Sequence, residues 1–396
     1  MRIAYVCADL GVPVFGRKGC SIHVQEVVRE LTRRGAQVEL FAVQCEGSPP
    51  PGLEEVTLHP LSNIPKGNCA AREQAALAMN QELLVKLEQE GPFDLVYERY
   101  SLWSFAGMEY ASSRGVPGLL EVNAPLIDEQ AEHRTLVDRA GAEHVAERAF
   151  RAASALVAVS SGVAEYLERY PAARGRVHTI PNGVDPGRFP PDQQPSCPAP
   201  AGIFTVGFVG TLKPWHGLTT LIDAFAQFHR CNSNTRLLIV GDGPERHNLE
   251  EDLASRGIGR AAHFAGSVAP EQIAGFLVSM DVAVAPYPKL SNFYFSPLKV
   301  YEYMAAGLPP VVSRVGQLAE LIQHEVNGYF CPPGDAQALT AALMRLRDDP
   351  LLRDRLGRAA RTTVLREHTW ESTVQRLLCL AGFGQALQLP PLASRA

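Results

Sequence analysis

Residues 291–313 combine a predicted helix start with polar groups that suit the binding of an anion. Ser296 is a favoured N-cap residue and Pro297 suits the first helical position, which predicts a helix that begins here and ends at Gly307. The first amide groups of a helix have no partner within the helix, and the helix dipole places partial positive charge beside them, so a diphosphate would be a matching ligand. These amide groups belong to Phe295, Ser296 and Leu298.

Lys299 and Glu302 lie one turn apart on one face of the same predicted helix. An ammonium at position 299 would add a full positive charge to the anion site. A carboxylate at position 302 can accept two hydrogen bonds from a ribose diol, which the backbone of the helix start cannot do. An ordinary capped helix with a surface glutamate is the alternative interpretation, which the two charges on one face disfavour.

Two glycine-containing turns elsewhere are candidates for contacting the same ligand. The sequence GTLKPWHG, residues 210–217, follows a predicted strand and opens a helix, and its glycines allow the backbone to approach a ligand closely. Lys213 and His216 can contact phosphate oxygens there, although a solvated lysine and a helix-terminal histidine are equally ordinary. The turn GDG, residues 241–243, lacks the third glycine of a dinucleotide fingerprint, so a plain strand-to-helix turn stays an alternative.

Polar residues in the N-terminal half follow the first strand or lie at the ends of later strands. Residues at the carboxyl ends of parallel strands face the ligand crevice of an open α/β sheet, so they are candidates for binding acceptor hydroxyls or for polarising the reacting one. For His23, near a helix start, a capping or packing role is the alternative. The candidates are Gly19, Ser21, His23, Glu98, Arg99, Glu121, Asn123 and Glu129.

The elements that position these residues alternate between short apolar runs and amphipathic helical patterns, which is typical of stacked βαβ units. The predicted strands cover 3–8, 38–43, 94–98, 118–123 and 155–160 in a first series and 204–210, 236–241, 281–287 and 309–313 in a second. The helix between the first two strands carries an apolar stripe at Val24, Val27, Val28 and Leu31. A proline-rich stretch over 191–202 separates the series and predicts a linker. We therefore predict an α/β fold with two doubly wound, Rossmann-like domains facing a central cleft.

The composition excludes several classes of protein. With 396 residues, 46% hydrophobic and 20% charged, the chain is long enough for two or three globular domains at ~150 residues each. A net charge of −5 argues against a general nucleic-acid binder. The eight cysteines form no C-x-x-C pair and no zinc-ligand pattern, and the first residues lack the pattern of a signal peptide. We expect a cytoplasmic chain whose contact with the inner membrane face, if any, is peripheral.

These motifs resemble the retaining GT-B glycosyltransferases, specifically glycosyltransferase family 4 (group 1), over nearly the whole chain. The family carries a Glu-x7-Glu motif whose second glutamate matches Glu302, and the resemblance implies that Glu302 holds the nucleotide ribose. The first glutamate falls at Tyr294, a departure that leaves recognition of the donor sugar open. The stretch VHTIPNGVDPGRF, residues 177–189, also resembles a family hallmark.

The family's arginine and lysine in the loop after the first strand of the second domain match Thr211 and His216 by position but not in type. Lys213 and Lys299 are then expected to supply the cations. The resemblance implies donor-binding residues Gly210, Thr211, Lys213, His216, Gly217, Gly241, Asp242, Gly243, Ser267, Val268, Tyr294, Phe295, Ser296, Pro297, Leu298, Lys299 and Glu302. It implies catalytic roles for His23, Lys213, Lys299 and Glu302.

The resemblance also implies that the N-terminal domain covers 1–190 with a returning helix over 371–396, and that the donor-binding domain covers 203–370. The expected reaction moves a sugar from a nucleotide-diphosphate sugar to a hydroxyl of a glycan, a lipid or a small molecule, with retention and without metal or other cofactor. The family's usual histidine near Asn123 is missing, so no general base is assigned. A nucleotide-sugar 2-epimerase and a non-catalytic nucleotide-sugar-binding protein are the alternatives.

Overall fold

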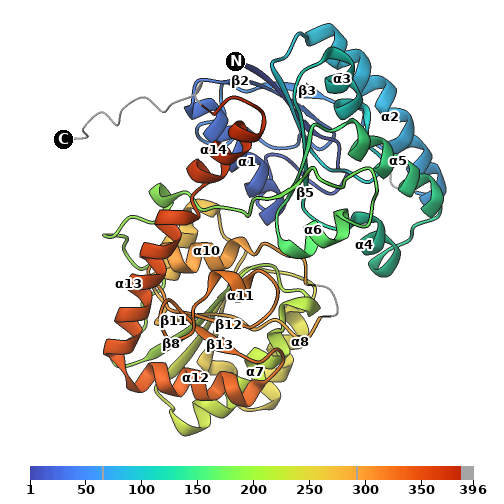
Figure 1. Ribbon diagram of the computed structural model, residues 1–396. Helices are drawn as coiled ribbons and strands as arrows, with labels where there is room; N and C mark the ends of the chain where they lie inside the picture. Colours follow the sequence, from blue (N-terminus) through green and yellow to red (C-terminus); the bar gives the residue numbers. More distant parts are fainter. Residues whose placement is uncertain (65–66, 291–292, 385–396) are drawn as a thin grey trace. The chain divides into compact units, whose positions relative to one another are not determined.

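A computed structural model describes residues 1–64, 67–290 and 293–384 (Figure 1). The chain divides into two compact units. Unit 1 consists of Met1–Asn182, Tyr294–Ser296 and the residues from Trp370 onward, and unit 2 consists of Gly183–Phe293 and Pro297–Thr369. Every helix among the described residues is too short or too polar to span a bilayer.

Unit 1 is built on a parallel sheet of seven strands in the order β3-β2-β1-β4-β5-β6-β7. Its strands are β1 (Arg2–Cys7), β2 (Gln37–Ala42), β3 (Thr57–Pro60), β4 (Leu95–Arg99), β5 (Gly118–Val122), β6 (Ala155–Ala158) and β7 (Val177–Thr179). The central strands are buried along nearly their whole length, as expected of a parallel sheet covered on both faces.

Seven helices belong to the described part of unit 1. They are α1 (Gly19–Arg33), α2 (Cys69–Glu90), α3 (Ala106–Arg114), α4 (Leu126–His133), α5 (Arg139–Ala152), α6 (Ser161–Leu167) and α14 (Trp370–Leu380). The predicted apolar stripe of α1 is buried, since Val24, Val27, Val28 and Leu31 are at most 2% exposed. The C-terminal α14 packs on α1 (Figure 1), where Arg34, just after α1, donates to the carbonyl oxygen of Glu371 over 2.9 Å.

Unit 2 is built on a second parallel sheet of six strands in the order β10-β9-β8-β11-β12-β13. Its strands are β8 (Phe204–Val209), β9 (Thr235–Val240), β10 (Ala262–Gly266), β11 (Val282–Ala285), β12 (Pro310–Ser313) and β13 (Tyr329–Cys331). Its helices are α7 (Leu218–Cys231), α8 (Arg246–Ser255), α9 (Ile273–Leu277), α10 (Leu298–Ala305), α11 (Leu318–Leu321), α12 (Ala336–Asp348) and α13 (Pro350–Glu367).

The predicted linker over 191–202 is part of unit 2 and packs against it. The amide of Ser196 donates to the carbonyl of Gly275 over 2.8 Å, and the amide of Cys197 donates to the hydroxyl of Ser279 over 3.0 Å. Prolines keep this stretch out of the sheet, but its remaining amides still need partners, and α9 and the residues just after it provide them.

The strand orders place one topological switch point in each unit. In unit 1 the order reverses between β1 and β4, and in unit 2 it reverses between β8 and β11. Loops leave neighbouring strands in opposite directions at such a point, which opens a crevice at the carboxyl ends of the strands. Each unit therefore has one favoured place for a ligand.

Candidate functional site

A shielded ammonium lies at the switch point of unit 2. The Nζ atom of Lys299, in the first turn of α10, is inaccessible to solvent and has no hydrogen-bond partner. It lies 4.3 Å from the ring centre of Phe208 in β8 and 5.5 Å from that of Tyr287, just after β11. Burial lowers the pKa of Lys299 to about 7, although Glu302 opposes this change. Aromatic faces only partly compensate a charge removed from water, so this site favours an incoming anion.

Two glycine turns pack against each other beside this ammonium. Gly210 and Gly241 have φ angles of 143° and 132°, which side chains rarely adopt. A Cβ atom at position 241 would lie 2.0 Å from the carbonyl oxygen of Gly210, and one at position 210 would lie 2.9 Å from the Lys299 Nζ. The amide of Leu212 also donates to the carbonyl of Asp242 over 3.0 Å. The structure thus brings together the two turns that the sequence analysis selected.

Other donor-site candidates in unit 2 surround these turns. The carbonyl of Gly266, at the end of β10, accepts the Gly241 amide over 2.8 Å, so Ser267 and Val268 follow directly from the same place. Gly217 is the N-cap residue of α7, and a Cβ there would lie 1.7 Å from the carbonyl oxygen of Pro286. Close backbone packing therefore requires a glycine at position 217.

The two basic side chains of the 210–217 loop, Lys213 and His216, differ in their surroundings. Lys213 is partly exposed, and its Nζ atom lies 5.5 Å from the centre of the Trp215 ring. His216 Nδ1 lies 2.6 Å from the carbonyl oxygen of Thr211. Burial and the neighbouring Lys299 lower the pKa of His216 to about 3, so the ring is neutral near pH 7 and Nδ1 carries the donated hydrogen. Lys213, and not His216, supplies the second positive charge in this loop.

The start of α10 differs from the prediction. The helix begins at Leu298, its N-cap residue is Pro297, and no side chain caps it. The hydroxyl of Ser296 instead accepts the amide of Asn182 over 3.2 Å, and the amide side chain of Asn182 donates to the Ser296 carbonyl over 2.8 Å. The predicted Ser296 cap is therefore wrong, because a partner far away in the sequence engages the hydroxyl.

The end of α10 follows the predicted glycine signal. Gly307 has a φ angle of 75°, its amide donates to the Met304 carbonyl, and the Leu308 amide donates to the Tyr303 carbonyl. This is the Schellman pattern, in which a glycine terminates the helix just after its last residues.

Glu302 is held by a partner that the sequence analysis did not select. Its carboxylate lies 3.1 Å from the guanidinium of Arg188, and both side chains are about four-fifths buried. Arg188 also donates to the carbonyl of Pro270 over 3.0 Å. Arg188 belongs to the 177–189 stretch, which the sequence analysis noted only for its resemblance to a family hallmark. The ion pair fixes the orientation of the Glu302 carboxylate.

In unit 1, Tyr294 contacts Glu129, a predicted acceptor-side residue. The Tyr294 hydroxyl donates to the Glu129 carboxylate over 3.0 Å, and the Tyr294 carbonyl accepts the hydroxyl of Ser160 over 2.6 Å. Phe295 packs beside Tyr294, with ring centres 4.4 Å apart. The structure therefore assigns Tyr294, Phe295 and Ser296 to unit 1, while Pro297, Leu298 and Lys299 belong to unit 2.

Four more acceptor-side candidates form one buried network centred on Glu121, near the end of β5. His23 Nε2 lies 2.7 Å from the Glu121 carboxylate, and Arg99 lies 3.4 Å from it. Tyr97 and Asn123 also donate to this carboxylate. Burial alone would raise the pKa of Glu121, but His23, Arg99 and Tyr97 together lower it to about 2.

His23 lies inside this network and is not open to solvent. The residue is 4% exposed, its Nδ1 atom is shielded without a partner, and its ring meets the Trp370 ring edge-on with centres 5.0 Å apart. His23 is therefore part of the buried network around Glu121, and a substrate could hardly reach its ring.

The remaining acceptor-side candidates lie apart from this network. Glu98 is fully buried and accepts the hydroxyl of Ser104, and burial raises the pKa of Glu98 to about 7. Ser21 is buried with an unpartnered hydroxyl, and Gly19 is exposed at the start of α1. The structure therefore does not gather all eight predicted residues into one site.

A cavity of about 230 Å³ lies at the switch point of unit 1. Loops after β1, β4 and β5 line it together with α2, and Glu129 is the one predicted acceptor-side residue among the lining residues. The sequence analysis missed Arg72 and Arg134, which also line it. Neither belongs to a recognisable motif, and only the fold brings them together.

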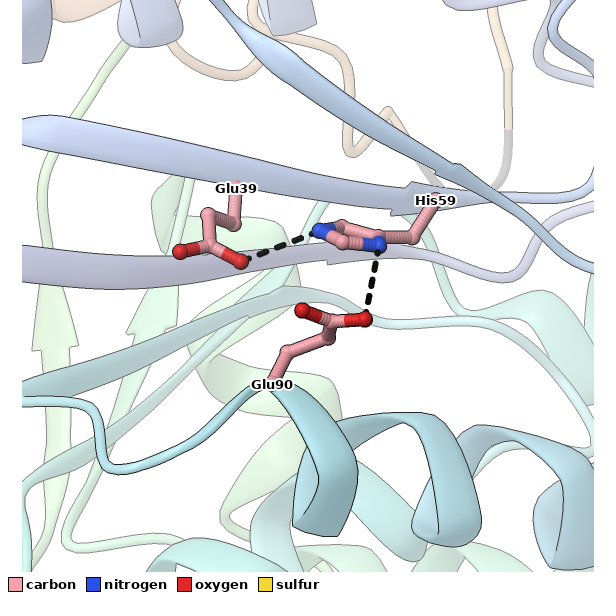
Figure 2. Close-up of side chains that lie close together, drawn as sticks. All are labelled: Glu39, His59 and Glu90. Atoms are coloured by element: carbon pink, nitrogen blue, oxygen red, sulfur yellow. Dashed lines mark hydrogen bonds and ion pairs between the residues drawn. The ribbon is translucent and has the colours of Figure 1, made fainter.

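A charged cluster in unit 1 joins Glu39, His59 and Glu90 (Figure 2). His59 Nε2 lies 3.0 Å from Glu39 and Nδ1 lies 3.7 Å from Glu90, so the two ring nitrogens face different carboxylates. Arg2 also pairs with Glu39. A single ion would need one ring nitrogen and both carboxylates on the same side, so we interpret this cluster as an ion-pair network that fixes the edge strand β3.

Two family models match the chain, one in each half. Glycosyltransferase Family 4 matches residues 17–188, and Glycosyl transferases group 1 matches residues 192–363. The chain belongs to the group 1 glycosyltransferases of the GT-B fold. It is therefore a glycosyltransferase enzyme, as the resemblance implied.

Curated relatives of this glycosyltransferase carry related names. A D-inositol 3-phosphate glycosyltransferase from Saccharomonospora viridis is 29% identical over 91% of the chain and 88% of its own length. A glycogen synthase from Mycobacterium tuberculosis is 29% identical over 52% of the chain and 49% of its own length.

Solved structures share the fold of this glycosyltransferase. A sucrose-phosphate synthase from Thermosynechococcus elongatus has a TM-score of 0.76 and 21% identity, covering 98% of this chain and all of that one. HepE from Anabaena, solved in complex with UDP and glucose, has a TM-score of 0.73 and 20% identity, covering 96% of this chain and 99% of that one.

Proposed function

We propose that this glycosyltransferase moves a sugar from a nucleotide-diphosphate sugar to a hydroxyl acceptor with retention of configuration and without a metal ion. The observation that carries the proposal is the unpartnered, shielded ammonium of Lys299 at the switch point of unit 2. An ammonium in this setting lacks only an anion, and the structural neighbour HepE binds UDP at a GT-B fold.

The side chains of unit 2 have separate roles in this proposal. Lys299 and Lys213 offset charge on the departing diphosphate, an electrostatic task that a divalent metal performs in other enzymes. The close packing of Gly210 and Gly241 holds these two backbone turns beside the Lys299 ammonium, where they would contact the phosphates. Glu302, which forms an ion pair with Arg188, accepts hydrogen bonds from the hydroxyls of the ribose.

To retain the configuration, we propose that the acceptor hydroxyl attacks the anomeric carbon from the same face from which the diphosphate departs. The bond between the anomeric carbon and the phosphate oxygen breaks while the acceptor oxygen bonds to the same carbon, and a departing phosphate oxygen takes the acceptor proton. No side chain acts as nucleophile in this scheme. His23 then has a positioning role, since it lies within the Glu121 network.

The eight cysteines are free thiols, which supports a cytoplasmic location.

The proposal is tested by calorimetry with UDP-, ADP- and GDP-glucose on the wild type and on Lys299→Ala and Lys213→Ala. Each substitution should weaken binding of the preferred donor by ~1.5–3 kcal/mol, the usual contribution of a charged hydrogen bond. Lys86→Ala, on α2 of unit 1, is the matched control, since its ammonium pairs with Glu82 on the surface. Unchanged donor affinity in both site variants would contradict the assignment.

A further inference from the structure

The cavity of unit 1 is lined by two arginines that form no ion pair with the described residues, although the carboxylates of Asp9, Glu73 and Glu129 line it as well. Arg72 lies in the first turn of α2 and Arg134 directly follows α4, and both line the cavity. Within the described residues, neither guanidinium has a hydrogen-bond acceptor or a carboxylate partner within 4 Å. The Arg72 Nε atom is moreover shielded from solvent without a partner. A shielded, unpaired donor on a charged group destabilises the free protein, so its presence indicates a ligand.

The carboxylates that line the same cavity are occupied by other groups. Glu73 accepts the amides of Val137 and Asp138 over 2.8 and 2.9 Å. Asp9 accepts the amide of Gly11 over 2.7 Å. Glu129 accepts the Tyr294 hydroxyl, as described above. Each of these three carboxylates therefore has a hydrogen-bond donor of its own, and none of them uses the guanidinium of Arg72 or Arg134.

The position of Arg134 is fixed by contacts with α2, the helix that carries Arg72. Because Glu73 on α2 binds the amides of the loop after α4, this loop is tied to the helix that carries Arg72. The side-chain amide of Gln130 adds a bond to the carbonyl of Thr135 over 2.9 Å. Both arginines are thus held at one cavity by partly buried and exposed hydrogen bonds that involve neither guanidinium.

We propose that this cavity binds the phosphoryl group of the acceptor, between Arg72 and Arg134. Guanidinium groups match the oxygens of a phosphate in geometry as well as in charge. The cavity lies at the switch point of unit 1, where the proposed function requires the acceptor, and the inference rests on that function. At about 230 Å³ it lies just below the usual ~300 Å³ lower limit for ligand pockets, so it fits one phosphorylated ring or a lipid head group.

Binding of defined phosphates to the full chain tests the proposal. Inositol 3-phosphate, glucose 6-phosphate and glycerol 3-phosphate are titrated by calorimetry, each against its unphosphorylated parent. Vesicles of phosphatidylcholine with and without phosphatidic acid form the lipid arm. We expect at least one phosphorylated probe to bind and its parent not to bind. Binding of the soluble probes assigns a free phosphorylated acceptor, and binding of the anionic vesicles alone assigns a lipid head group.

Arg72→Gln and Arg134→Gln should each weaken this binding about 10- to 150-fold, the equivalent of one charge-assisted hydrogen bond. Arg114→Gln, whose guanidinium pairs with Glu88 on the surface of the same unit, should leave it unchanged. Arg72→Gln should not lower the melting temperature, because the replaced guanidinium makes no hydrogen bond or ion pair with the described residues. If no phosphorylated probe binds, or if both arginine variants bind as the wild type does, the proposal is wrong.

Donor titrations separate this result from a failure of the proposed function. The arginine variants should keep the wild-type affinity for the nucleotide sugar, and Lys299→Ala should keep the affinity for the phosphorylated probe. Donor binding with no probe binding would overturn the acceptor inference alone. Probe binding with no donor binding would confirm the anion site and contradict its role as an acceptor site.

Discussion

The hydroxyl of Tyr294 donates a hydrogen bond to the carboxylate of Glu129 over 3.0 Å. Tyr294 occupies the position of the first glutamate of the family motif, and Glu129 reaches it from α4. A carboxylate therefore still accompanies this position, but it comes from another part of unit 1. The departure from the motif has a local structural role that can be measured.

Tyr294→Phe should destabilise the protein by about 0.5–1.5 kcal/mol, because it removes one hydrogen bond and leaves Glu129 to solvent. The free energy of unfolding is measured with urea. Tyr100→Phe is the matched control, since the Tyr100 hydroxyl is buried without a partner and its removal should cost nothing. Equal losses in both variants would contradict a role for the Tyr294 bond.

Glu121→Gln should destabilise the protein by about 3–5 kcal/mol at pH 7, because it leaves the buried His23 and Arg99 without their carboxylate. The pKa of Glu121 is lowered from 4.5 to about 2. The carboxylate therefore contributes its full stabilisation above pH ~4.5, and this contribution is lost as pH falls toward 2. Thermal unfolding from pH 7 to pH 3 should show a shallower acid slope in the variant than in the wild type.

Lys299→Met should make the ligand-free protein more stable at pH 7, because it removes a shielded charge without a partner. The folded pKa of about 7 lies below the ordinary 10.5, so the unfolded state binds more protons between these values. Stability of the wild type should thus rise with pH across this range, and the advantage of the variant should shrink by pH 10. An unchanged advantage at pH 10 would show that the effect is not due to the charge.

Gly241→Ala should destabilise unit 2 by more than the ~1–2 kcal/mol that a left-handed backbone alone costs. The added Cβ would collide with the Gly210 carbonyl, which is backbone and cannot rotate away. Gly257→Ala is the control, because Gly257 has a φ angle of 72° and open space around its Cβ direction. Calorimetric unfolding of both variants measures the difference, and similar losses would mean that the two turns can separate.

Most of the fold could be predicted from the sequence because its central strands are continuous apolar runs. The apolar stripe of α1 and the glycine end of α10 were predicted correctly for the same local reasons. Strands β3, β7, β10 and β13 were missed, since each has three to five residues and lies at an edge of its sheet. Strands that are this short and partly exposed show no clear periodicity of apolar residues in the sequence.

The site was less predictable because tertiary contacts decide it. Local sequence selected Lys299 and Glu302, but Arg188 as the partner of Glu302 depends on folding. The Ser296 cap failed because Asn182 engages the hydroxyl. Arg72 and Arg134 lie 62 positions apart and share no motif, so only the arrangement of α2 and α4 around the sheet brings them to one cavity.

The C-terminal helix has a consequence for chimeras made between homologues. Arg34 donates to the carbonyl of Glu371, and His23 packs its ring against Trp370. A chimera that takes only residues 1–182 from a homologue would place the counterparts of Arg34 and His23 against the α14 helix of this chain. Transplanting the N-terminal half therefore requires carrying α14 with it, because its contacts with α1 and with Arg34 complete that unit.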